Sequence, residues 1–156
     1  MTSTVAVHMI CSLLSYAAFL IAFASGVLFL IQERQLKHKT MGVLFHWLPS
    51  LEALDRLNFI AIGAGFGLLS IGLICGMAGE RMLLGHWWSG DSKEYLTAIL
   101  WVSYCLLWLV RLRSTLRGRR VALLSILGFS FVLFTFVGAG WVLPSWHQAV
   151  NGLVGG

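Results

Sequence analysis

The stretch Leu57–Ala78 reads LNFIAIGAGFGLLSIGLICGMA, and it decides the fold class of the chain. It contains no charged residue and has about the 20 residues that an α-helix needs to cross a bilayer. Small residues recur in it at a spacing of four, in the pairs Gly63–Gly67 and Gly72–Gly76. This spacing puts them on one helix face and permits close approach of a second backbone. The stretch predicts a transmembrane helix whose groove either packs against another helix or leaves room for a planar cofactor.

Three more apolar runs accompany this one along the chain. The four predicted spans are roughly Val5–Ile31, Leu57–Ala78, Leu96–Leu112 and Val121–Leu143. Of the 156 residues, 58% are hydrophobic and 11% are charged, whereas a soluble domain has about 25% charged residues. The first run is too long for a signal-peptide core and no Lys or Arg precedes it, so we expect a retained helix. We predict an all-α integral membrane bundle of about four transmembrane helices, forming a single domain over residues 1–156.

The basic residues orient this bundle. Nine of the eleven lie between the first and second spans or from the end of the third span to the start of the fourth. Only Arg81 and Lys93 lie between the second and third spans. The positive-inside bias therefore places the N-terminus and the C-terminus outside. We expect a multi-pass protein of the inner (plasma) membrane, in contact with lipid, whose arginines anchor the topology and do not bind nucleic acid.

Two histidines from opposite ends of the chain are predicted to meet at the outer face. His8 lies near the outer end of the first span, and His147 follows the outer end of the fourth. A neutral imidazole is a good axial ligand for haem iron, so one ring from each helix could hold a haem between them. His86 is a fallback ligand, whereas His38 and His46 are expected to be solvated residues of the inner loop.

Aromatic residues gather at the same predicted level as this histidine pair. They are Trp87, Trp88, Tyr95, Trp141 and Trp146. Their rings suit a flat apolar macrocycle, and they equally suit an interfacial aromatic belt that needs no ligand.

The sequence lacks the usual signatures of an enzyme. It has no glycine-rich phosphate loop, no paired carboxylates within a span and no charged residue in the middle of a span. The last point argues against an ion-coupled transporter. None of the cysteines forms a C-x-x-C pattern, so covalent haem attachment and a zinc site have no support. We do not expect the chain to be an enzyme by itself.

The segment His86–Tyr95 reads HWWSGDSKEY, and Trp101 follows it. It resembles the tryptophan-rich WWD segment of the cytochrome c assembly family, which contains the CcsA, ResC and HemX-like membrane proteins. Other short segments also resemble this family, and together they cover nearly the whole chain: Leu13–Ala17, Leu30–Arg34, Leu48–Glu52, Leu54–Leu57, Phe134–Phe136 and Leu143–Pro144.

The resemblance implies roles for particular residues. The two external histidines that ligate haem in the family fall on His8 and His147. The segment that cradles exposed haem falls on Trp87–Glu94, which includes Trp88 and Asp91. This chain departs from the family pattern at Gly90, Ser92 and Leu96, where the family has tryptophan, proline and tryptophan. The histidine that some members carry inside a later helix is replaced near Trp108–Leu109, so a deeper haem would lack its ligand.

The leading hypothesis is a b-type haem held non-covalently between His8 and His147 for haem handling in cytochrome c maturation. Arg81, Lys93 and Ser89 are the candidate partners of its propionates. This function predicts other membrane subunits and an apocytochrome c as partners. Two alternatives stay open. The chain could be a b-type cytochrome subunit that passes electrons to a redox partner on the outer face, or a haem-free assembly or regulatory scaffold.

Overall fold

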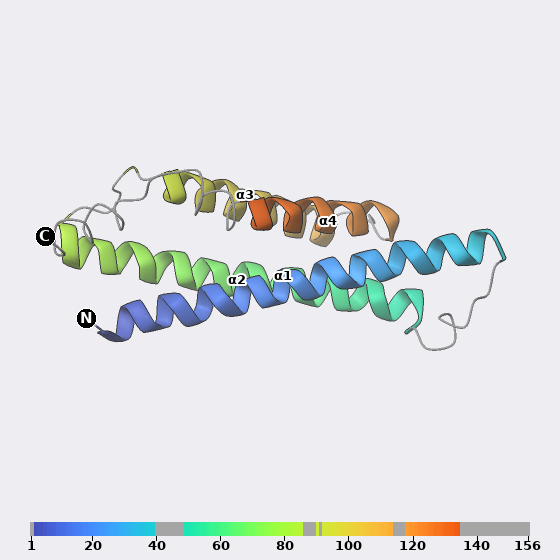
Figure 1. Ribbon diagram of the computed structural model, residues 1–156, viewed down its shortest axis with the longest axis horizontal. Coiled ribbons are helices and arrows are strands. Elements are labelled where there is room, and N and C mark those ends of the chain that lie inside the picture. The colour runs from blue at the N-terminus through green and yellow to red at the C-terminus, as the bar shows by residue number, and fades with distance from the viewer. Residues whose placement is uncertain (1, 40–48, 86–89, 91, 114–117, 135–156) are drawn as a thin grey trace, which may run out of the picture.

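The computed structural model describes residues 2–39, 49–85, 90, 92–113 and 118–134, and within them all regular structure is helical. Four helices follow one another along the chain (Figure 1). They are α1 (Thr2–Lys37), α2 (Leu51–Leu84), α3 (Ser92–Arg113) and α4 (Arg119–Leu133). The predicted all-α bundle is therefore confirmed.

Three of these helices are long and apolar enough to cross a membrane. The qualifying segments are Ala6–Lys37, Leu51–Met82 and Glu94–Arg113. The helix α1 has 36 residues, which corresponds to about 54 Å at 1.5 Å per residue. It therefore extends well beyond a hydrocarbon core of about 30 Å. The fourth predicted span is described as helix α4 up to Leu133, and its remaining part lies outside the described residues.

The helices pack in an up-and-down arrangement in which each has two main neighbours. The antiparallel helices α1 and α2 lie side by side along the long axis, and α3 and α4 lie together across from them (Figure 1). The helix α1 contacts α2 and α4, and α3 also contacts α2 and α4. Large apolar side chains such as Leu13, Ile74 and Leu127 are more than 60% exposed. A lipid environment accommodates such an apolar surface, whereas water does not.

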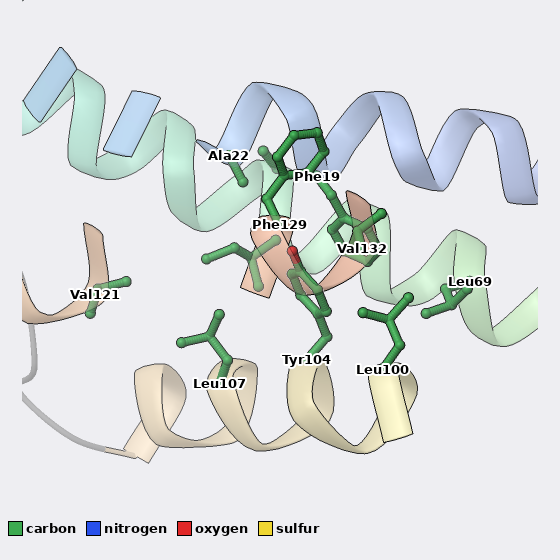
Figure 2. Packing of buried hydrophobic residues seen from close by; sticks show 11 residues of the cluster. Phe19, Ala22, Leu69, Leu100, Tyr104, Leu107, Val121, Phe129 and Val132 are labelled. Atoms are coloured by element: carbon green, nitrogen blue, oxygen red, sulfur yellow. The ribbon is translucent and has the colours of Figure 1, made fainter. Parts of the chain in front are cut away.

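An aromatic stack occupies the middle of the bundle. The rings of Phe19 in α1 and Tyr104 in α3 stack with their centroids 3.7 Å apart, and both residues are almost fully buried. Figure 2 shows these two rings pointing toward each other, with Phe129 of α4 beside them. A Cβ atom at Gly65 of α2 would overlap the Phe19 ring. The glycine thus leaves the space in which the stack forms.

Most of the glycines of α2 lie against side chains of neighbouring helices. This agrees with the first of the two predicted roles, which was packing against another helix. A Cβ atom at Gly63 would lie 2.9 Å from the indole nitrogen of Trp108 in α3. At Gly72 it would lie 3.2 Å from the hydroxyl oxygen of Ser12 in α1. Gly67 and Gly79 are the exceptions, because a Cβ atom at either position would meet nothing within 4 Å.

A buried amide connects three helices. The side-chain nitrogen of Asn58 in α2 donates to the carbonyl oxygen of Ala22 in α1 at 2.7 Å. It also lies 3.1 Å from the hydroxyl oxygen of Ser125 in α4. Because a polar group inside a bilayer finds no water partner, hydrogen bonds of this kind hold helices together.

One ion pair joins α2 and α3 near the end of the bundle that holds most of the basic residues. The guanidinium of Arg111 binds both carboxylate oxygens of Asp55, at 3.0 and 2.7 Å. The Arg111 side chain is only 6% exposed and that of Asp55 is 20% exposed. The same carboxylate accepts the backbone N–H of Gly118 at 3.1 Å, just before α4 begins. A single aspartate thus fixes the relative positions of three helices.

We expect Asp55→Asn to destabilise the bundle by about 3 kcal/mol, because it leaves a nearly buried guanidinium without its counter-charge. The measurement is the free energy of unfolding in detergent micelles. The control is Glu33→Gln, which breaks the exposed 3.9 Å pair between Glu33 and Arg119 and should cost no more than about 1 kcal/mol. Equal losses in the two variants would contradict the structural role of Asp55.

Candidate functional site

The candidate site lies at one end of the bundle, where α1 begins, α2 ends and α3 begins (Figure 1). We call it the His8 end, and the positive-inside bias predicts that it faces outward. His8 is in the second turn of α1 and is half-buried. Arg81 is in the last turn of α2 and is exposed. These two predicted site residues therefore lie at the same end of the molecule.

The ring of His8 is held against the backbone of α2. Its Nδ1 atom lies 2.7 Å from the carbonyl oxygen of Gly72. Since a carbonyl can only accept, Nδ1 carries the proton and donates. The ring also lies over Gly76, where a Cβ atom would be 2.9 Å from Nδ1 and 3.0 Å from Cε1. Any residue larger than glycine at position 76 would therefore displace the ring.

This hydrogen bond determines what the imidazole can do. With the proton on Nδ1, the lone pair of the neutral ring is on Nε2. A histidine that ligates a metal commonly donates its other ring N–H to a carbonyl in this way, which orients the ring and raises its basicity. His8 thus has the tautomer and the support that a metal-binding imidazole commonly has, with Nε2 as the atom that could bind.

The described residues contain no group of three His, Cys, Asp or Glu side chains that could hold a metal ion. A haem does not need such a group, because the porphyrin supplies four nitrogens and the protein adds one or two axial ligands. The single imidazole donor at His8 therefore agrees with the ligand set of a haem.

The structure does not describe the other residues that were predicted to form the site. The second predicted ligand, His147, lies outside the described residues, and so do the fallback ligand His86 and the residues Trp87, Trp88 and Asp91. Of the six residues proposed to bind the cofactor, the structure positions His8 and Arg81. The inner-loop residue His38 is exposed at the opposite end of α1, as predicted, and His46 is not described.

The backbone at Gly90 accounts for one departure from the family pattern. Gly90 has a φ of +75°, a conformation that residues with a side chain rarely adopt. Its N–H donates to a carboxylate oxygen of Glu94 in the first turn of α3 at 3.0 Å. A tryptophan in this conformation would be strained, whereas glycine adopts it without strain.

The helix α3 shows what occupies the region where some family members carry an inner histidine. The Trp108 indole lies against Gly63 of α2 and packs at 5.8 Å on the ring of Phe66. Phe66 in turn packs at 5.5 Å on Trp101, whose indole N–H donates to the hydroxyl of Ser70 at 2.8 Å. Aromatic side chains thus fill the interface between α2 and α3.

The sequence indicated Gly72 and Gly76 as a close-contact pair but did not indicate that His8 packs against them. Their four-residue spacing was visible and predicted a close helix contact, but not the side chain that would enter it. His8 and Gly72 lie 64 residues apart along the chain, so no local sequence pattern predicts their contact.

An apolar cleft of about 400 Å³ lies elsewhere, between α3 and α4. Its lining includes Leu107 and Val110 of α3 and Leu124 and Phe131 of α4. Among the described residues of the predicted site, neither His8 nor Arg81 lines this cleft.

These features define a class: a multi-pass helical membrane protein that presents a histidine from α1 against the backbone of α2. The chain belongs to the cytochrome c assembly protein family, because the model of that family matches residues 2–147. The resemblance seen in the sequence is therefore confirmed.

Relatives with established names support the same assignment. A cytochrome c biogenesis protein CcsA from Prochlorococcus marinus subsp. pastoris is 32% identical over 94% of this chain and 53% of its own length. The protein of the same name from Guillardia theta is 30% identical over 90% of this chain and 52% of its own length. The chain spans about half the length of these relatives. No solved structure matches it.

The orientation of the bundle can be tested by thiol labelling after the native cysteines Cys11, Cys75 and Cys105 are replaced by serine. Lys37→Cys and Arg81→Cys then place one thiol at each end of the bundle, at exposed positions. A membrane-impermeant maleimide added to intact cells should label Arg81→Cys, and Lys37→Cys only after permeabilisation. The reverse pattern would overturn the predicted topology.

Proposed function

We propose that this chain binds one b-type haem non-covalently between His8 and His147 at the outer face of the membrane, for haem handling in cytochrome c assembly. The observation that carries the proposal is the 2.7 Å hydrogen bond from His8 Nδ1 to the Gly72 carbonyl. It gives His8 the tautomer and support typical of a metal-bound imidazole. The family assignment and the names of the relatives support the link to cytochrome c biogenesis.

Several other residues complete the proposed site. Arg81 lies at the His8 end and is exposed, so its guanidinium can bind a haem propionate. Lys93 and Ser89 are further propionate partners. We propose that Trp87, Trp88 and Asp91 belong to the segment that cradles the exposed part of the haem. Residues 1–156 would then act as a single haem-binding domain.

The ligand set limits the chemistry. A haem held by both histidines would have no open position for oxygen chemistry, and it could be carried, displayed or used in electron transfer. His8 is fixed by the backbone of α2, so we propose that His147 is the ligand that releases when haem is passed on. The chain then acts as a carrier rather than an enzyme by itself.

The proposed role requires partners on the outer side of the membrane. An apocytochrome c must present its cysteine thiols there, and other membrane subunits would bring it to the site. We propose that the membrane is the inner (plasma) membrane, with the basic segments on the cytoplasmic side.

A second candidate is a b-type cytochrome subunit of an electron-transfer complex. The observation that favours it is Gly90, which stands where the family has a tryptophan and whose backbone disfavours one. A changed tryptophan segment would leave the haem ligands intact while altering the surface that delivers haem. A haem-free scaffold is the third candidate.

We expect His8→Ala and His147→Ala each to weaken haem binding by more than the roughly tenfold that loss of a supporting hydrogen bond costs. Haem content and reduced-minus-oxidised spectra of the purified protein are the measurement. His38→Ala is the matched control, because His38 lies at the opposite end of α1, and it should keep its haem. Full occupancy in the His8/His147 double variant would refute the assignment.

Haem transfer separates the two haem-dependent functions. The purified haem-loaded protein is mixed with a reduced apocytochrome c, and the appearance of the covalent c-type spectrum is followed. A carrier should lose its haem to the apoprotein, because one of its ligands must release. A cytochrome subunit should retain its haem and exchange electrons at a constant midpoint potential.

A further inference from the structure

We propose that Gly72 and Gly76 of α2 are the positioning element for the His8 ligand, and that they select Nε2 as the atom that binds iron. The inference rests on the proposed function, since it assumes that His8 ligates haem. It adds a role for two residues that make no contact with the haem.

The geometry of an α-helix explains why glycine is needed at position 76. The carbonyl of residue 72 accepts the N–H of residue 76 within the helix, and its second lone pair remains for an outside donor. A side chain at position 76 would tilt toward the helix N-terminus and cover the turn that holds this carbonyl. Glycine leaves the carbonyl of Gly72 uncovered, and the His8 ring occupies the space of the missing Cβ atom.

The same register continues one turn along both helices. Ser12 is one turn after His8 on α1, and its hydroxyl oxygen would lie 3.2 Å from a Cβ atom at Gly72. His8 and Ser12 thus face Gly76 and Gly72 in antiparallel order. Both glycines of this pair meet polar side chains, whereas Gly63 and Gly65 meet the aromatic residues Trp108 and Phe19. The side chains that face this pair therefore differ in chemistry from those that face Gly63 and Gly65, although all four glycines admit a close helix contact.

The hydrogen bond would also change the midpoint potential of the haem iron. A carbonyl that accepts from Nδ1–H makes the imidazole a stronger donor through Nε2. A stronger axial donor favours ferric over ferrous iron and so lowers the midpoint potential. The backbone of α2 would thus set both the orientation of His8 and the redox state in which haem is held most tightly.

The test compares Gly76→Ala with Gly67→Ala. Both variants exchange glycine for alanine within α2, so both gain the same helix propensity, but a Cβ atom at Gly67 meets nothing within 4 Å. Hemin affinity and midpoint potential are measured on the full-length protein in detergent. Gly76→Ala should weaken hemin affinity about tenfold or more and make the potential more positive. Gly67→Ala should change neither, and a potential unchanged in Gly76→Ala would overturn the inference.

A double-mutant cycle separates positioning from packing. If Gly76 acts through His8, the effect of Gly76→Ala on hemin affinity should disappear in the His8→Ala background. An equal effect in both backgrounds would overturn the inference. Wild-type hemin affinity and spectra in His8→Ala alone would instead overturn the proposed function, so the two failures are distinguishable.

One measurement needs no change to the helix contact and covers the case in which Gly76→Ala fails to fold. Nitrogen NMR of the haem-free protein with isotope-labelled histidine, assigned by comparison with His8→Ala, reports which ring nitrogen of His8 carries the proton. The inference requires a protonated, hydrogen-bonded Nδ1. A neutral ring protonated on Nε2 would overturn it.

Discussion

The close approach of α1 to the glycines of α2 is the contact on which the rest of the structure depends. Apolar helices in lipid gain little from hydrophobic burial against each other, so they associate through close packing and hydrogen bonds. At Gly65 the missing side chain admits the Phe19 ring, which then stacks on Tyr104 of α3. At Gly76 it admits the His8 ring. The central stack and the candidate site thus arise from the same helix face.

Polar groups complete the framework because a bilayer offers them no water. Asn58 connects α2 to α1 and α4 through hydrogen bonds. Asp55 binds Arg111 of α3 and the backbone at the start of α4. Such groups are costly in lipid unless they are paired. Their pairing here sets the positions of the helices at the end opposite His8, while the glycine contacts set the positions at the His8 end.

The combination of a preserved histidine and a changed outer segment bears on function. The support of His8 by the α2 backbone is what a haem ligand requires. The positive φ of Gly90 disfavours the tryptophan that the family has at this position. The proposed haem binding thus rests on the helix framework, whereas the proposed haem delivery rests on the outer segment.

The sequence by itself determined the fold class and three of the four predicted spans, because hydrophobic runs and the placement of charges are local features that govern membrane insertion. Its short motifs determined the family. It also pointed to His8 as a ligand and to the small residues of α2 as a contact face. Only the tertiary structure decided that His8 meets Gly72 and Gly76, and that Asp55 pairs with Arg111. These partners lie 64 and 56 residues apart. The rotation and register of each helix select them, and both depend on how all the side chains pack together.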